Sequence, residues 1–192
     1  MANPKLRLLD SDVISNLLMM KVRSDVSISI SNDSSNFDLL TTQVVIREVQ
    51  TGINKIDKTN KINGNAISDN EISKIKRTWN EIKNIFTIRE VKEDPSTLKN
   101  SGERSLVGIL STIKKENCRI VSNNGKDVFR FLERENLPKK YYQYPFEFFE
   151  EMGKSWFKNY KDMIRFIILS NHDFRVIKKG NLGNILTRVK TM

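Results

Sequence analysis

Short apolar runs alternate with amphipathic stretches along the first two thirds of the chain. The run Leu6–Leu9 predicts a strand over about residues 5–9, and the spacing after it predicts a helix over about 11–20. The same patterns predict further strands at about 37–42, 86–91 and 118–122, and further helices at about 42–56, 71–86, 102–117 and 127–136. This alternation is typical of an α/β fold, in which a central parallel sheet carries helices on both faces.

Polar and aromatic segments interrupt this pattern. Residues 24–36 begin as an alternating strand or hairpin and end as a polar loop, and the Gly/Asn-rich residues 57–70 predict a loop. We expect a core over residues 1–137 with a variable insertion at about 57–92. We expect residues 138–192 to form a C-terminal extension packed on the core, aromatic and basic, with one or two helices broken near Gly153.

The composition limits which partners and metals we expect the protein to bind. The chain has 33 Lys and Arg against 23 Asp and Glu, and the formal charge of +10 favours nucleic acid before acidic membrane surfaces or acidic proteins. A single cysteine, Cys118, excludes an internal disulfide, and with a single histidine, His172, a zinc site is disfavoured. A metal would therefore have oxygen ligands, which favours Mg²⁺ or Mn²⁺. No apolar window spans a membrane and no signal-peptide pattern begins the chain, so we expect a cytoplasmic protein.

Acidic side chains stand where predicted strands end and helices begin. Asp10 and Asp12 follow the first strand, Glu103 begins a later helix, and Asp127 follows a later strand. Glu48, one to two turns into its helix, can point at the same cleft. Ligands bind outside the carboxyl ends of parallel strands, so we expect these groups at one edge of the sheet. Clustered carboxylates repel one another, and a divalent cation would offset that repulsion, activate water and stabilise charge on a phosphodiester.

In this order and spacing, three sequence pieces resemble the PIN-domain ribonucleases, especially the toxin nucleases of bacterial toxin–antitoxin pairs. The pieces are LLDSDVISNLL, TTQVVIREVQTG and GERSLVGILSTIKKENCRIVSNNGKD. The resemblance covers roughly residues 5–134, apart from about 57–92. It implies that Asp10, Glu48 and Glu103 bind Mg²⁺ or Mn²⁺ and that RNA is the substrate. It also implies an antitoxin protein as a partner and a homodimer.

One position departs from the family pattern. Asn124 stands where the resemblance places a fourth acid, and we expect Asp127, one turn away, to take over its role in catalysis and metal binding. Asp12, Ser122 and Asn124 would support the site. Asn124 also favours a second hypothesis, a PIN-like nucleic-acid-binding or regulatory module that has weak turnover or none. A third hypothesis is a protein-interaction partner such as an immunity-type protein.

Most of these positions also have a purely structural interpretation. Acids are favoured in the first turn of any helix, so Asp12, Glu103 and Asp127 are also typical of ordinary helix starts. The aromatic run YYQYPFEFF would either stack on bases or pack in the core. The basic helix at 71–86 would either contact RNA phosphates or form a solvated face. Its candidate contacts are Lys74, Lys76, Arg77 and Lys83.

Overall fold

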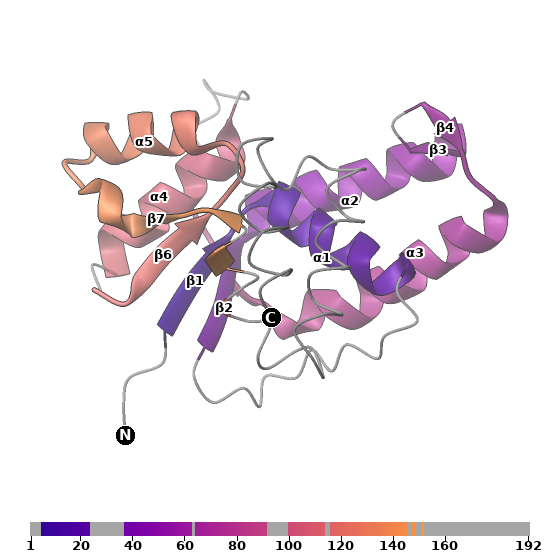
Figure 1. Cartoon of the computed structure of the whole chain (residues 1–192), viewed down its shortest axis with the longest axis horizontal. Coiled ribbons are helices and arrows are strands. Elements are labelled where there is room, and N and C mark those ends of the chain that lie inside the picture. The colour runs from indigo at the N-terminus through magenta and orange to yellow at the C-terminus, as the bar shows by residue number, and fades with distance from the viewer. Residues whose placement is uncertain are drawn as a thin grey trace, which may run out of the picture.

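Five parallel strands form the central sheet of the protein. The structure is a computed structural model that describes residues 5–23, 37–62, 64–91, 100–113, 116–145, 147, 148 and 151. The strand order is β5-β2-β1-β6-β7, and each neighbouring pair is parallel (Figure 1). The strands are β1 (Lys5–Leu9), β2 (Phe37–Thr42), β5 (Thr87–Arg89), β6 (Cys118–Val121) and β7 (Tyr142–Gln143). The expected α/β fold with a central parallel sheet is confirmed.

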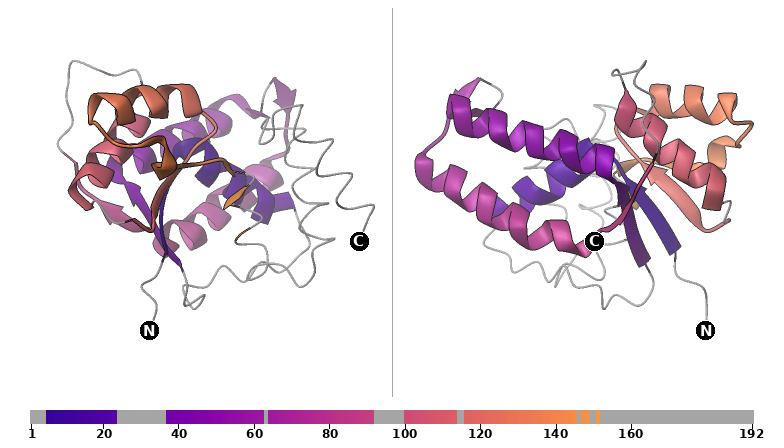
Figure 2. Two further views of the ribbon diagram at one scale, coloured as in Figure 1. Left: turned by 60° about the vertical axis from the view of Figure 1, so that its left-hand side comes forward. Right: turned by 180° about the vertical axis from the view of Figure 1, so that it is seen from behind.

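Helices cover both faces of the sheet. Figures 1 and 2 show α1, α2 and α3 on one side and α4 and α5 on the other. The helices are α1 (Ser11–Arg23), α2 (Gln43–Thr59), α3 (Asp69–Ile82), α4 (Ser101–Ile113) and α5 (Gly125–Arg134), with short 3₁₀ turns η1 (Lys83–Ile85) and η2 (Lys139–Tyr141). The usual right-handed crossover predicts this arrangement, because the chain moves outward from β1 to β5 and then returns across the sheet to β6.

The middle strand β1 is buried on both of its faces. Leu8 and Leu9 are fully buried, and they lie in register with Leu40 of β2 and Val121 of β6. A continuous apolar run is what a parallel strand covered on both sides requires. The apolar faces of the helices complete the core. Their largest fully buried side chains are Ile14, Leu17, Ile75, Ile82, Leu106, Leu110 and Leu132.

Local capping sets the ends of α2 and α3, which extend side by side away from the sheet (Figure 1). The Thr42 hydroxyl accepts a hydrogen bond from the Val45 backbone and begins α2. Asn60 ends α2 with a φ of 50°, in the left-handed region. Ser68 and Glu71 form a capping box that begins α3.

Several segments differ from the expectations drawn from the pattern. The expected loop at 57–70 contains the last residues of α2, a two-stranded hairpin and the start of α3. That hairpin pairs β3 (Lys61–Ile62) with β4 (Asn65–Ala66). Strand β5 lies inside the expected insertion at 57–92, and β7 lies inside the expected extension at 138–192. The strand expected at about 86–91 is confirmed by β5. Strand β7, with two residues, is too short for the alternation of side chains to indicate it.

Other expectations lie outside the described residues. These are the strand or hairpin at 24–36, the helix break near Gly153, and the loop position of His172. Within the described ranges, no helix combines the length and apolar character needed to cross a membrane.

Candidate active site

The candidate active site lies where β1 and β6 end. After β1 the chain enters α1 on one face of the sheet, and after β6 it enters α5 on the other face (Figure 1). Neighbouring strands whose helices diverge in this way leave a crevice between them, where open α/β sheets bind ligands. We call the acids at this edge the acidic cluster. Its members are Asp10, Asp12, Glu48, Glu103 and Asp127.

Asp10 is a buried carboxylate held in place from two sides. The residue is only 3% exposed. Oδ1 accepts a hydrogen bond from the Ser11 backbone at 2.7 Å, and Oδ2 accepts one from the Ser122 hydroxyl at 2.6 Å. Burial, followed by the charges of Asp12 and Glu103, raises the pKa of Asp10 well above its ordinary value, although the two hydrogen bonds oppose that shift.

Asp12 has one satisfied oxygen and one unsatisfied oxygen. Oδ2 accepts a hydrogen bond from the Asn123 backbone at 2.8 Å, which ties the start of α1 to the turn after β6. Oδ1 is buried and has no hydrogen-bond partner among the described residues. Burial is the main reason that the pKa of Asp12 rises to about 6. An unsatisfied buried carboxylate oxygen is open to a cation or to a water bound to one.

Glu48 reaches the cluster from α2 and meets the first turn of α4. Its Oε1 accepts hydrogen bonds from the Ser101 hydroxyl and the Gly102 backbone, both at 3.1 Å. A Cβ placed on Gly102 would lie 2.8 Å from Oε2 of Glu48 and 3.2 Å from Oδ1 of Asp10. Two carboxylates from distant parts of the chain therefore converge on one point, and glycine leaves the room for them.

Asn124 links the other two acids of the cluster. Its side-chain Nδ2 donates to Oε1 of Glu103 and, at 2.6 Å, to Oδ2 of Asp127. Because a neutral amide donates to both acids, it holds them together without adding charge. Asp127 also forms an ion pair with Arg130 at 2.9 Å, so it lies at the rim of the cluster. An aspartate at position 124 would have no such donor and would add a negative charge.

Tyr142 also contacts the site, although no sequence motif indicates it. Its hydroxyl donates to the Ser122 carbonyl at 2.7 Å, and a Cβ placed on Gly125 would lie 2.9 Å from the hydroxyl oxygen of Tyr142. Burial, then the neighbouring Tyr144 hydroxyl and Asp12, raises the pKa of Tyr142, so it remains a hydrogen-bond donor. Tyr142 thereby fixes the end of β6 that carries Ser122. Its location in a two-residue strand explains why sequence patterns do not find it.

Three arginines surround one aromatic ring next to the cluster. The guanidinium carbons of Arg104, Arg130 and Arg134 lie 5.9, 5.0 and 5.7 Å from the centre of the Phe131 ring. Arg104 follows Glu103 directly in α4, and Arg130 pairs with Asp127. We call Arg104, Arg130 and Arg134 the arginine group.

The basic residues expected to contact RNA lie elsewhere. Lys74, Lys76 and Arg77 are on α3, and Lys83 begins the η1 turn that follows it. Lys76 pairs with Asp57 of α2 at 2.7 Å. The structure thus brings the five acids to one edge of the sheet and leaves these four basic residues on another part of the fold.

The donor chemistry of the cluster fits a hard divalent cation. Its ligand atoms are carboxylate oxygens, which Mg²⁺ and Mn²⁺ prefer, and one of them, Oδ1 of Asp12, has no hydrogen-bond partner among the described residues. Within the described parts of the chain, no three Asp, Glu, His or Cys side chains are already arranged to hold a metal ion. Asp10 and Glu48 accept hydrogen bonds from hydroxyl and backbone donors, and their carboxylates keep further lone pairs for a cation.

No family model, curated protein or solved structure matches this chain. Its function is therefore inferred from its own residues and their arrangement.

Proposed function

We propose that the protein is a metal-dependent ribonuclease that hydrolyses RNA phosphodiester bonds, as its resemblance to the PIN-domain ribonucleases implies. The observation that carries the proposal is the convergence of Asp10 and Glu48 over Gly102. Carboxylates this close repel one another, and a divalent cation between them removes the repulsion. Burial first, and then the charges of Asp12 and Glu103, raises the pKa of Asp10, and a bound cation would oppose both causes.

Asp10, Glu48 and Glu103 would hold one Mg²⁺ or Mn²⁺, with Asp12 and Asp127 beside them. When bound, the cation supplies a Lewis acid for the phosphodiester and lowers the pKa of attacking water. The chain itself orients the acids. Two neighbouring residues do so directly, because the Ser122 hydroxyl holds Oδ2 of Asp10 and the Asn123 backbone holds Oδ2 of Asp12. Both donors favour ionised carboxylates, the form that binds a cation.

The arginine group would hold the RNA backbone next to the acids. Planar guanidinium groups bind phosphate oxygens through two parallel hydrogen bonds, and the Phe131 ring limits how far these three side chains move. Arg104 and Arg130 are next to, or paired with, members of the acidic cluster. A phosphate held there lies beside the carboxylates. The expected contacts from α3 remain a second, separable prediction about RNA binding.

The direct test measures RNA cleavage with Mn²⁺ and again with excess EDTA. Wild type should cut single-stranded or structured RNA only with the metal, and Asp10→Asn should lower the rate by about a thousandfold or more. Asp38→Asn is the matched control, because Asp38 is an exposed acid in β2. Equal cleavage by wild type and Asp10→Asn, or cleavage that persists in EDTA, would contradict the proposal.

Asn124 favours a second candidate function, an RNA-binding or regulatory module with little turnover. The resemblance places a metal-binding acid at this position, and the neutral amide that stands there gives the site one negative charge fewer. Asn124→Asp tests this candidate. A large gain in cleavage in that variant, from a wild type that binds RNA without cutting it, would favour the binding module. RNA binding by neither protein would instead favour a protein-interaction role.

A toxin role, an antitoxin partner and a homodimer belong to the same resemblance, and the cytoplasmic location expected from the sequence pattern is proposed with them. Induced expression in bacteria tests the first of these. Wild type should arrest growth, and Asp10→Asn, expressed to the same level, should not. Arrest by both proteins would separate toxicity from the acidic cluster.

A further inference from the structure

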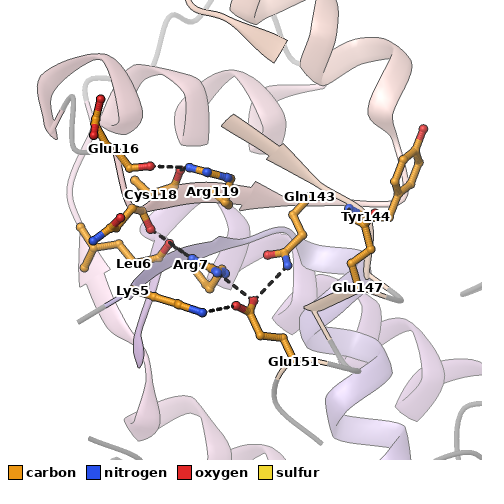
Figure 3. Close-up of polar contacts among 11 residues, drawn as sticks. Lys5, Leu6, Arg7, Glu116, Cys118, Arg119, Gln143, Tyr144, Glu147 and Glu151 are labelled. Carbon is orange, nitrogen blue, oxygen red and sulfur yellow. Dashed lines mark hydrogen bonds and ion pairs between the residues drawn. The ribbon is translucent and has the colours of Figure 1, made fainter. Parts of the chain in front are cut away.

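A second polar pocket lies near the start of β1, at the other end of that strand from Asp10. Its volume is about 320 Å³, and its lining includes Lys5, Arg7, Asn117, Arg119, Gln143 and Glu151. Figure 3 shows the Glu151 carboxylate between the basic side chains of β1 and the amide of Gln143. The pocket shares no residue with the acidic cluster.

Arg7 is a buried cation whose hydrogen-bonding capacity is only partly used. The residue is 5% exposed. One terminal nitrogen donates to the carbonyls of Leu6 and Asn117 at 3.0 and 3.1 Å, and the other, Nη2, donates to Glu151 at 2.8 Å. Nε is buried and has no partner among the described residues. Because Nε and Nη2 form the fork that binds two oxygens of one anion, Glu151 occupies half of that fork.

Glu151 occupies the pocket as an anion. Its carboxylate accepts hydrogen bonds from Lys5 at 2.6 Å, Arg7 at 2.8 Å and Gln143 at 3.0 Å. Burial acts to raise the pKa of Glu151, but these donors outweigh it and lower the pKa to about 2. Oε1 of Gln143 is also buried and has no partner among the described residues, and an ionised carboxylate has no proton to offer it.

The pocket therefore contains one unused donor and one unused acceptor around a single negative charge. Monohydrogen phosphate has the matching chemistry, with three acceptor oxygens and one hydroxyl donor, and in a monoprotonated phosphate monoester the ester oxygen takes the place of one of those acceptors. Two oxygens would engage Nε and Nη2 of Arg7, a third would engage Lys5, and the hydroxyl would donate to Oε1 of Gln143. Sulfate has the same shape but no proton at neutral pH, so it would leave Gln143 unsatisfied.

We propose that this pocket binds a phosphate monoester or inorganic phosphate, and that Glu151 occupies the anion's place in the unliganded protein. The ligand displaces the Glu151 carboxylate and completes the fork of Arg7. This site contains none of the acids proposed for the nuclease function. It shares one lining residue with the candidate active site, Tyr142, whose hydroxyl donates to the Ser122 carbonyl, and the proposed phosphate contacts do not use that residue.

Calorimetric titration in EDTA tests the proposal with inorganic phosphate as the probe. Glu151→Gln removes the competing charge, and we expect it to bind phosphate about tenfold more tightly than wild type. Glu147→Gln is the matched control, because Glu147 lines the same pocket but accepts from the Tyr144 backbone. We expect that control to change affinity by less than about threefold. If the two variants bind phosphate equally, the proposal is wrong.

Two further variants test the fork and the acceptor in the Glu151→Gln background. Arg7→Lys keeps the charge but loses the fork, and it should weaken phosphate binding about tenfold. Because Arg7 is buried, circular dichroism checks its folding, and Lys5→Ala, whose side chain is 51% exposed, gives a second test that is expected to weaken binding about fivefold. Gln143→Ala should reduce the preference for phosphate over sulfate. Equal binding of phosphate and sulfate by the Gln143-containing protein overturns the assignment.

The source of the phosphate is resolved with a dinucleotide bearing either a 5′-phosphate or a 5′-hydroxyl. Binding of the phosphorylated form alone indicates an RNA end, and binding of inorganic phosphate alone indicates the free ion. Asp10→Asn should bind phosphate as wild type does. Failure of the nuclease proposal and failure of this one are therefore distinguishable.

Discussion

At the scale of single residues, Asp10 and Asp12 are held where their ionised forms are disfavoured. Burial is the leading cause for both, and mutual repulsion adds to it for Asp10. The fold tolerates this because backbone and hydroxyl donors partly offset the cost. Groups whose pKa values are displaced in this way are typical of functional sites, where an arrangement that suits the chemistry lowers the stability of the fold.

We expect the free energy of unfolding to fall as the pH rises from about 4.5 to about 6. The pKa of Asp12 is raised from 3.8 to about 6, so in this range the native protein keeps a proton that the unfolded chain has lost. The stabilisation is present at low pH and is lost as the pH rises through the native pKa. A shift of this size corresponds to about 3 kcal/mol.

Urea denaturation in EDTA across this range measures the effect. Starting at pH 4.5 limits the opposite contribution of Glu151, whose lowered pKa of about 2 adds stability only up to its ordinary value of 4.5. Asp12→Asn should make the decline shallower and leave the part that comes from Asp10, whose pKa is also raised by burial, and Asp38→Asn should leave the decline unchanged. A decline of equal slope in wild type and Asp12→Asn would show that Asp12 is not its source.

At the scale of elements, sequence patterns predicted the strands and helices, which depend mainly on neighbouring residues. Apolar runs indicated β1, β2 and β6, and the spacing of apolar residues indicated the helices that follow them. The same logic placed Asp10 and Glu103 at one sheet edge, because parallel strands end together. What it could not predict are contacts between distant elements, such as Glu48 on Gly102, which depend on how α2 crosses the start of α4.

Asn124 and Tyr142 show the same limit. The resemblance identified Asn124 as a departure from a family pattern, but not as a donor to two acids at once. That role depends on where α5 begins relative to α4. Tyr142 belongs to a two-residue strand in an aromatic run, and nothing in the run distinguishes a residue that contacts the end of β6 from one that packs in the core.

We expect Gly102→Ala to weaken divalent-cation binding while the protein still folds. The new Cβ would displace the flexible carboxylates of Glu48 and Asp10 from the point where they converge. Gly52→Ala is the matched control, because a Cβ at that position of α2 meets nothing within 4 Å. It should stabilise the protein by about 0.5–1 kcal/mol, as alanine does when it replaces glycine in a helix.

The rise in melting temperature on adding Mn²⁺ measures both variants, because a ligand that binds only the native state stabilises it. Gly102→Ala should lose at least half of that rise, and Gly52→Ala should keep all of it. An unchanged Mn²⁺ effect in Gly102→Ala would mean that the convergence of carboxylates is not where the metal binds.

At the scale of the whole molecule, basic side chains of the described residues form two separate groups. The arginine group lies beside the acidic cluster on α4 and α5, whereas the α3 group of Lys74, Lys76, Arg77 and Lys83 lies on and just after the helix that extends from the sheet (Figure 1). Under the proposed function, both groups would attract RNA over long range. Only a phosphate held by the arginine group is placed next to the carboxylates that would act on it.

We expect the two basic surfaces to differ in their contribution to RNA binding. Replacing the three members of the arginine group with alanine should weaken binding of single-stranded RNA in EDTA and reduce the slope of log affinity against log salt by about 2, because each phosphate that the protein neutralises adds about 0.7 to that slope. Replacing the α3 group with alanine removes four charges, yet it should change the slope less. Fluorescence anisotropy at several salt concentrations measures both. A larger decrease in the α3 variant would indicate that RNA binds along α3 instead. Replacing the arginine group with lysine separates the effect of charge from that of the fork geometry.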